Sequence, residues 1–132
     1  ADRVTEENLE QAVVFAKEFA HKTGAIIAIT GEIDIVADAN KSFCIRNGHK
    51  AMSGITGTGC QLSAMTAAYV TANPEHPLTA AAAVCAMGLC GENARKRMSE
   101  EDGNASYRNY IIDAVCNLTA EKLEKGAKYE VR

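Results

Sequence analysis

The first 24 residues carry apolar side chains at helical spacing. The positions that share this spacing are Leu9, Ala12, Val13, Ala16, Phe19 and Ala20. Residues three, four and seven apart lie on one face of an α-helix, so the pattern predicts an amphipathic helix that buries this stripe. Thr5 is suited to cap its start, and Gly24 is a natural stop. His21, in the last turn, is expected to be solvated.

Three strands are predicted next. Residues 25–30 form an unbroken apolar run of strand length, which is typical of a strand buried on both faces of a parallel sheet. Residues 33–36 and 42–45 predict two short antiparallel strands at a sheet edge, joined by a turn rich in Asp and Asn. Asp34 and Asp38 are expected to be solvated or capping groups, with metal carboxylates as the alternative.

The rest of the chain predicts helices. One covers residues 59–71, with Leu62, Met65, Tyr69 and Val70 on its apolar stripe, and the next covers residues 78–98. An amphipathic helix spans residues 107–118, and a short one runs from Thr119 to Gly126, after which the last two residues are expected to fray. The predicted order is a helix, one buried strand, two edge strands and then helices only. This order is typical of the second part of an α/β layer fold.

Composition narrows the class of protein. At 132 residues the chain is one domain at most, and 47% hydrophobic residues allow a real core. The net charge of −3 and the lack of a Lys/Arg stripe argue against a nucleic-acid surface. Between residues 51 and 90 only Glu75 is charged, so this segment is expected to be the buried centre. Its apolar run is shorter than the roughly 20 residues that cross a bilayer.

The cysteines indicate a reducing environment. There are five, an odd number, and no C-x-x-C pair occurs. Disulfide scaffolds and zinc sites both favour paired, closely spaced cysteines. Free and mostly buried thiols in the cytoplasm are therefore expected, and no secretory signal opens the sequence.

The segment at residues 55–64 combines glycines, threonines and a cysteine before a predicted helix. Glycine permits sharp turns, and a helix start offers unpaired N–H groups and partial positive charge. Together they predict an anion-binding site, and the partial positive charge at the helix start also favours the thiolate of Cys60. The alternative is a tight loop entering a buried helix, with Cys60 as a core residue.

Common phosphate and nucleophile motifs do not fit this segment. No Lys follows the glycines as in a P-loop, and Leu62 stands where a dinucleotide motif has its third glycine. Thr58 and Leu62 replace the glycines of a nucleophile elbow around Cys60. His49 lies in a turn without a nucleophile beside it, so a structural or substrate-shaping role is expected.

Three segments together resemble the hydroxyethylthiazole kinase family, which is ribokinase-like. They are Thr30-Gly31-Glu32 with Asp34, Asn47-Gly48-His49, and Thr56-Gly57-Thr58-Gly59-Cys60. The resemblance runs from about Thr5 to Leu118. It implies the C-terminal half, across residues 1–132, of a single kinase domain with a three-layer α/β/α fold. It also implies a homotrimer whose active sites lie between subunits.

The resemblance implies ATP- and Mg²⁺-dependent phosphorylation of the hydroxyl of 4-methyl-5-(2-hydroxyethyl)thiazole in thiamine salvage. It places Thr30, Gly31 and Glu32 near ATP, Gly57 at the thiazole, and Cys60 as the base beside the attacking hydroxyl. The N–H groups of Thr58, Gly59 and Cys60 would form the anion hole. No metal ligands are assigned, since Glu32 and Asp34 are the only nearby acids.

Two departures from the family matter. Its members are about twice as long, so an N-terminal half would be a partner. The loop before Tyr107 reads Asp-Gly-Asn-Ala-Ser instead of the family's usual proline-containing form. A kinase of another small alcohol, or an inactive nucleotide-binding half that stabilises a partner chain, are the alternatives.

Overall fold

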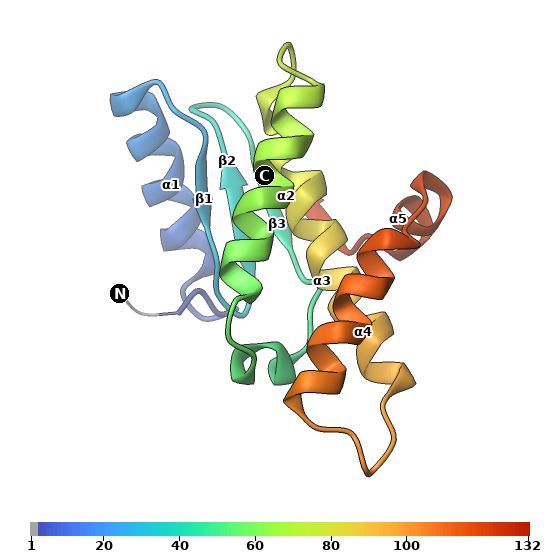
Figure 1. The fold of residues 1–132 in the computed structure, drawn as a ribbon. Coiled ribbons are helices and arrows are strands. Elements are labelled where there is room, and N and C mark those ends of the chain that lie inside the picture. The colour runs from blue at the N-terminus through green and yellow to red at the C-terminus, as the bar shows by residue number, and fades with distance from the viewer. Residues whose placement is uncertain (1–2) are drawn as a thin grey trace.

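The chain folds into three layers, with helices on both faces of a small sheet (Figure 1). The computed structural model describes residues 3–132. In chain order its elements are α1 (Leu9–Thr23), β1 (Ile27–Ile29), β2 (Asp34–Ala37), β3 (Ser42–Ile45), the 3-10 turn η1 (Lys50–Gly54), α2 (Thr58–Ala72), the 3-10 turn η2 (Pro77–Thr79), α3 (Ala80–Arg97), α4 (Asn104–Cys116), α5 (Ala120–Gly126) and β4 (Tyr129–Val131).

The sheet is antiparallel throughout, in the order β1-β2-β3-β4. Alternate residues of β2 feed the two halves of the core, because successive side chains of a strand point to opposite faces. Ile35 packs with Leu9 and Val13 of α1 on one face. Val36 packs with Val84 of α3 on the other. The strand β2 therefore contributes to the core on both faces of the sheet, and helices cover both faces, as in the predicted α/β class.

The placement of the strands differs from the prediction. Residues 25–30, predicted to be buried on both faces, supply β1 at the edge of the sheet, where Ala28 is exposed and its neighbours in β1 are only partly buried. The two predicted edge strands, β2 and β3, are the central ones. Residues 131–132 are not frayed: Val131 belongs to β4, and the backbones of Arg132 and Ser42 exchange two hydrogen bonds of 2.8 and 2.9 Å.

The helices match their predictions in position but not always in burial. α1 ends at Gly24, as expected, but begins after Asn8, whose side chain accepts the N–H of Thr5 at 2.8 Å. Phe19, placed on the buried stripe, is 46% exposed. α2 was expected in the buried centre, yet all of its residues are at least partly exposed. The buried part of the uncharged segment is instead in α3, of whose 18 residues 12 lie in the core.

In residues 3–132 no helix combines the length and the apolar character that a bilayer crossing requires.

A buried amide joins three distant segments. Asn47 is 5% exposed; its side chain donates to the carbonyl of Gly126 at 2.9 Å and accepts the N–H of Lys128 at 2.7 Å. It also donates to Glu92, whose carboxylate accepts the N–H of Gly48 and pairs with the Lys128 ammonium. Burial raises the pKa of Glu92, but these donors outweigh it and hold the pKa below its usual value.

Replacing this amide tests how strongly it holds the C-terminal segment. Asn47→Ala leaves the carbonyl of Gly126 and the N–H of Lys128 without their partner, so we expect a loss of about 2–4 kcal/mol in the free energy of unfolding. Urea denaturation measures it. Asn109→Ala, on the exposed surface of α4, is the matched control and should cost less than about 0.5 kcal/mol. Equal losses would contradict the role assigned to Asn47.

Candidate functional site

The loop before α2 is anchored on both sides. Ile55 is 6% exposed and packs in a cluster with Met87 and Tyr107. The carbonyl of Gly54 accepts a hydrogen bond of 3.0 Å from the side chain of Asn104. Asn104, the first residue of α4, belongs to the segment that departs from the family's usual sequence, so here an amide tethers the start of α4 to the loop before α2.

Glycine is required at position 57 by its backbone. Gly57 caps α2 with φ +97°, in the left-handed region that other residues rarely adopt. A side chain there would meet no atom within 4 Å, so conformation and not space demands the glycine. Thr58 begins α2 directly after this turn, and the next two residues, Gly59 and Cys60, are exposed.

The first turn of α2 offers backbone donors. Its first helical hydrogen bond runs from the N–H of Gln61 to the carbonyl of Gly57, at 3.0 Å. The N–H groups of Thr58, Gly59 and Cys60 precede that bond, and Gly57 has no side chain to cap them. The Thr58 hydroxyl points away from them, donating to the carbonyl of Ile55 at 3.4 Å. The geometry fits an anion.

Cys60 lies in this first turn and is exposed. This contradicts the alternative in which it is a small core residue. Its thiol is therefore accessible beside the backbone donors. Cys44, Cys85 and Cys90 are buried, and Cys116 is exposed on α4.

The predicted ATP segment is the turn between β1 and β2. Gly31 donates its N–H to the carboxylate of Asp34 at 2.8 Å. The carbonyl of Val4 accepts the N–H groups of Glu32 and Ile33 at 3.2 and 3.1 Å. A side chain at Gly31 would approach the Val4 backbone to 2.9 Å, so this close packing requires glycine. Thr30 and Glu32 are exposed.

Asp34 holds the β1–β2 turn through Gly31 and lies on β2 beside the core that α2 packs against. It is a capping group, as expected, but it is not fully solvated, and burial raises its pKa to about 6. It shares a face of β2 with Val36, which clusters with Leu62 near the start of α2. Figure 1 shows the β1–β2 turn and the start of α2 at the same end of the fold. The structure thus gathers residues 30–34 and 57–60 at one end of the molecule.

Two of the remaining candidate residues, His49 and Asp38, hold turns, and the third, His21, is exposed. His49 accepts the N–H of Ala51 on Nδ1 at 3.1 Å and so caps η1. Asp38 accepts the N–H groups of Asn40 and Lys41, both at 2.7 Å, which holds its pKa below its usual value. His21 is exposed at the end of α1. Asn47 and Asn104 stand in segments that the sequence analysis names, but their anchoring contacts were not predicted, because nothing in their local sequence indicates which distant carbonyl they contact.

The described residues, 3–132, do not form a complete metal site on their own. Among residues 3–132, no three His, Cys, Asp or Glu side chains converge as metal ligands. These residues therefore supply no complete set of ligands for the ion that the resemblance implies.

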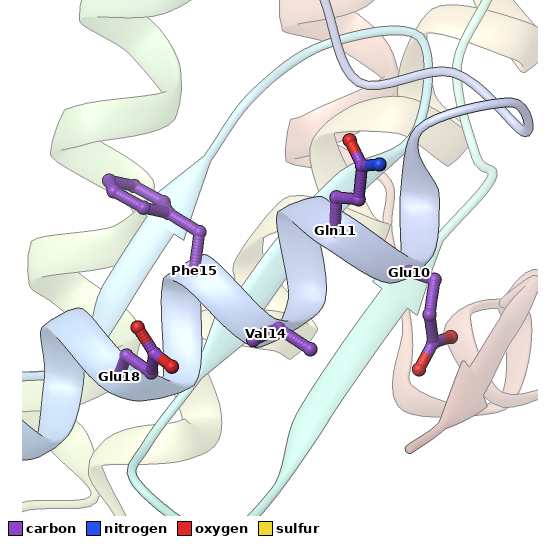
Figure 2. Close-up of a pocket in the computed structure, with 5 residues that line it drawn as sticks. All are labelled: Glu10, Gln11, Val14, Phe15 and Glu18. Atoms are coloured by element: carbon purple, nitrogen blue, oxygen red, sulfur yellow. The ribbon is translucent and has the colours of Figure 1, made fainter.

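One shallow hollow lies elsewhere, on the outer surface of α1 (Figure 2). Its lining residues are Glu10, Gln11, Val14, Phe15 and Glu18. All five come from one helix and none from the turns described above. We place the site at the start of α2, where backbone donors and a thiol meet, and not in this hollow.

Comparison with known proteins agrees with this fold. The model of the hydroxyethylthiazole kinase family matches residues 3–121. A hydroxyethylthiazole kinase of Clostridium acetobutylicum is 58% identical over 98% of this chain and 48% of its own length. One of Alkaliphilus oremlandii is 36% identical over 93% of this chain and 45% of its own length.

A solved structure extends the likeness to the fold. The hydroxyethylthiazole kinase protein of Pyrococcus horikoshii OT3 superposes with a TM-score of 0.82, at 26% identity, over 96% of this chain and 48% of that one. The chain therefore shares the α/β fold of a kinase, and it belongs to the hydroxyethylthiazole kinase family. It spans about half the length of the curated relatives it matches.

Because the pKa of Asp34 is raised, removing the charge of its side chain should increase the free energy of unfolding, and the increase should depend on pH. A carboxyl whose pKa is raised from 3.8 to about 6 on folding is most favourable when protonated, and the protein loses stability as the pH rises through 6. Asp34→Asn keeps an oxygen for the Gly31 N–H without the charge. We expect it to stabilise the fold by about 1–2 kcal/mol at pH 7.5 and by much less at pH 4.

Urea unfolding at the two pH values measures this difference. Asp38→Asn is the matched control of opposite sign, because the pKa of Asp38 is lowered and its charged form is the favourable one. It should therefore lose stability at pH 7.5. A gain for Asp34→Asn that does not change with pH would argue against a protonation effect.

Thiol labelling tests the exposure of Cys60. Iodoacetamide should modify Cys60 and Cys116 quickly in the folded protein, because both are exposed. Cys85 and Cys90 should react only after unfolding, since burial raises the pKa of each to about 11. Mass spectrometry of intact and digested protein identifies the sites. Slow labelling of Cys60 in the native chain would place it in the core after all.

Proposed function

We propose that this chain forms the phosphoryl-transfer half of a hydroxyethylthiazole kinase. That enzyme would transfer the γ-phosphoryl group of ATP to the hydroxyl of 4-methyl-5-(2-hydroxyethyl)thiazole, a step of thiamine salvage. The observation that carries the proposal is the open first turn of α2, where unpaired N–H groups stand beside an exposed Cys60. Membership of the family supplies the substrate class.

Phosphoryl transfer depends on positioning and on stabilising negative charge, and it needs little covalent chemistry from the protein. The N–H groups of Thr58, Gly59 and Cys60 would receive the charge that builds on the phosphoryl oxygens. Because the α2 dipole places partial positive charge at the same point, these donors act together. Gly57 would lie against the thiazole, where its lack of a side chain leaves room.

Cys60 would act as the base. Its thiolate takes the hydroxyl proton while the alcohol oxygen bonds to the γ-phosphorus and the bond to the ADP oxygen breaks. The products are the thiazole phosphate, ADP and a Cys60 thiol. Thr30, Gly31 and Glu32 would contact ATP from the β1–β2 turn, which Asp34 and Val4 hold in shape.

The site would be completed outside this chain. The turns at residues 30–34 and 57–60 form one wall, and the relatives are about twice as long. We place the remaining wall on the amino-terminal half of the family's chain and any Mg²⁺ that accompanies ATP on ligands there. The same family likeness supports a homotrimer, and five free thiols support a reducing compartment such as the cytoplasm.

The direct test is ATP consumption with the thiazole alcohol and Mg²⁺. It is run on this chain alone and on the chain co-expressed with the uncovered amino-terminal part of the Clostridium acetobutylicum relative. Turnover only in the second sample supports the proposal. ATP binding without turnover in both would identify an inactive nucleotide-binding half, and turnover with other small alcohols only would change the substrate.

Removing the thiol tests the mechanism. Cys60→Ala should lower kcat of the active preparation by roughly 10²–10⁴-fold, the scale of a general base, with a smaller effect on KM. Cys116→Ala, which removes the other exposed thiol, is the matched control and should leave kcat within about twofold. An unchanged kcat for Cys60→Ala would limit this residue to its backbone N–H.

A further inference from the structure

One peptide group at the base of the candidate site is bonded on both of its polar atoms. This is the peptide that joins Gly54 to Ile55. Its carbonyl accepts a hydrogen bond of 3.0 Å from the side-chain amide of Asn104. Its N–H donates to the carbonyl of Met52 at 3.1 Å. Because the side chain of Ile55 is also buried, the backbone is held at this point from three directions.

Only two residues separate this peptide from α2. Thr56 is exposed, and Gly57 has no side chain with which to pack. The hydroxyl of Thr58, the first residue of α2, donates back to the carbonyl of Ile55 at 3.4 Å. A shift of the backbone at Ile55 is therefore carried into the first turn of α2, whose N–H groups are the proposed anion donors.

A supported element presents the amide of Asn104. Tyr107, in the same turn of α4, is 1% exposed and donates its hydroxyl to the carbonyl of Gly91 in α3 at 3.0 Å. The loop before α4 is held by Asp102, whose carboxylate accepts the N–H and the hydroxyl of Ser99 at 2.8 and 3.0 Å. Residues that position a site do so accurately when packing and hydrogen bonds fix the element that carries them.

The fold itself depends little on this amide. Asn104 is exposed, and within residues 3–132 its side chain makes one hydrogen bond, to Gly54. Water can replace a hydrogen bond at an exposed position, so its net contribution to stability is small. The buried amide of Asn47 differs, because it satisfies groups that water does not reach. The contact of Asn104 instead sets the direction of one peptide beside the site.

We propose that Asn104 is a positioning residue for phosphoryl transfer. By holding the carbonyl of Gly54, its amide sets the direction in which the first-turn N–H groups of α2 meet the reacting phosphoryl group. Asn104 touches no reacting atom and acts through the loop. Rates respond steeply to such geometry, since a misplacement of about 1 Å that originates far from the chemistry can cost about 100-fold. The inference rests on the proposed function.

The kinetic test replaces the amide with an apolar group of similar size. Asn104→Leu removes the donor, and leucine is a good helix former at the start of α4. The variant is assayed in this chain co-expressed with the uncovered amino-terminal part of the Clostridium acetobutylicum relative. We expect kcat to fall roughly 10–100-fold and KM for the thiazole alcohol to stay within about twofold, because the donors act on charge that develops in the transition state.

Two further variants separate the amide from the helix that carries it. Asn104→Gln keeps an amide donor on a longer side chain and should recover most of kcat. Asn109→Leu makes the same change as Asn104→Leu on the exposed surface of α4, and it should leave kcat within about twofold. The melting temperatures of all three variants should lie within about 2 °C of the unaltered chain.

Hydrogen exchange gives a readout that needs no turnover. The amide of Ile55 is bonded to the carbonyl of Met52, and it can open more often when its peptide loses the bond to Asn104. NMR on this chain alone should show exchange at Ile55 at least about fivefold faster in Asn104→Leu than in the unaltered chain. Asn109→Leu should leave this rate unchanged.

The two readouts separate the possible failures. An unchanged kcat, a loss that Asn109→Leu shares, or an unchanged exchange rate at Ile55 overturns the positioning role. Loss of kcat together with a large fall in melting temperature overturns it as well, because Asn104 would then be needed for the fold. No turnover in the unaltered preparation removes the proposed function and the reaction that Asn104 would serve, whereas faster exchange at Ile55 would still establish the tether.

Discussion

The contact on which the rest of the structure depends is the buried amide of Asn47. It connects the exit of β3 to α3 through Glu92 and to the C-terminal segment through Gly126 and Lys128. A buried polar group stabilises only when its bonds are satisfied, and here both ends of the amide are used. The loop toward α2 begins directly after Asn47, so the same contact fixes the start of the loop that leads to the candidate site.

Further contacts along this loop position the candidate site. Ile55 and the Asn104 tether hold the loop, and Gly57 turns it so that α2 begins with its donors outward. At the neighbouring turn, Val4 and Asp34 hold Gly31. Rigid elements thus hold the glycines and threonines of both turns in one arrangement. Pre-organised donors of this kind cost little reorganisation when charge develops on a ligand.

Local pattern predicted the helices, the antiparallel pair β2–β3 and the segment at residues 57–60, because spacing, caps and glycines act over a few residues. It failed where burial depends on distant neighbours. The apolar run at residues 25–30 has the composition of a strand buried on both faces but lies at an edge, and the uncharged α2 is exposed. β4 was missed since its pairing with β3 spans most of the chain. The roles of the individual site residues stay predictions.

The unequal edges of the sheet have a consequence for aggregation. A sheet with two unprotected edge strands can pair with a further copy at each edge and so grow into a fibril. Within residues 3–132, the charged side chains of Arg132, Glu130 and Arg46 obstruct β4, whereas the other edge strand, β1, carries no charged residue. Two copies that met at β1 would use up both open edges and present only charged ones. Association of this stretch of sequence through β1 would then stop at closed pairs, without unlimited growth.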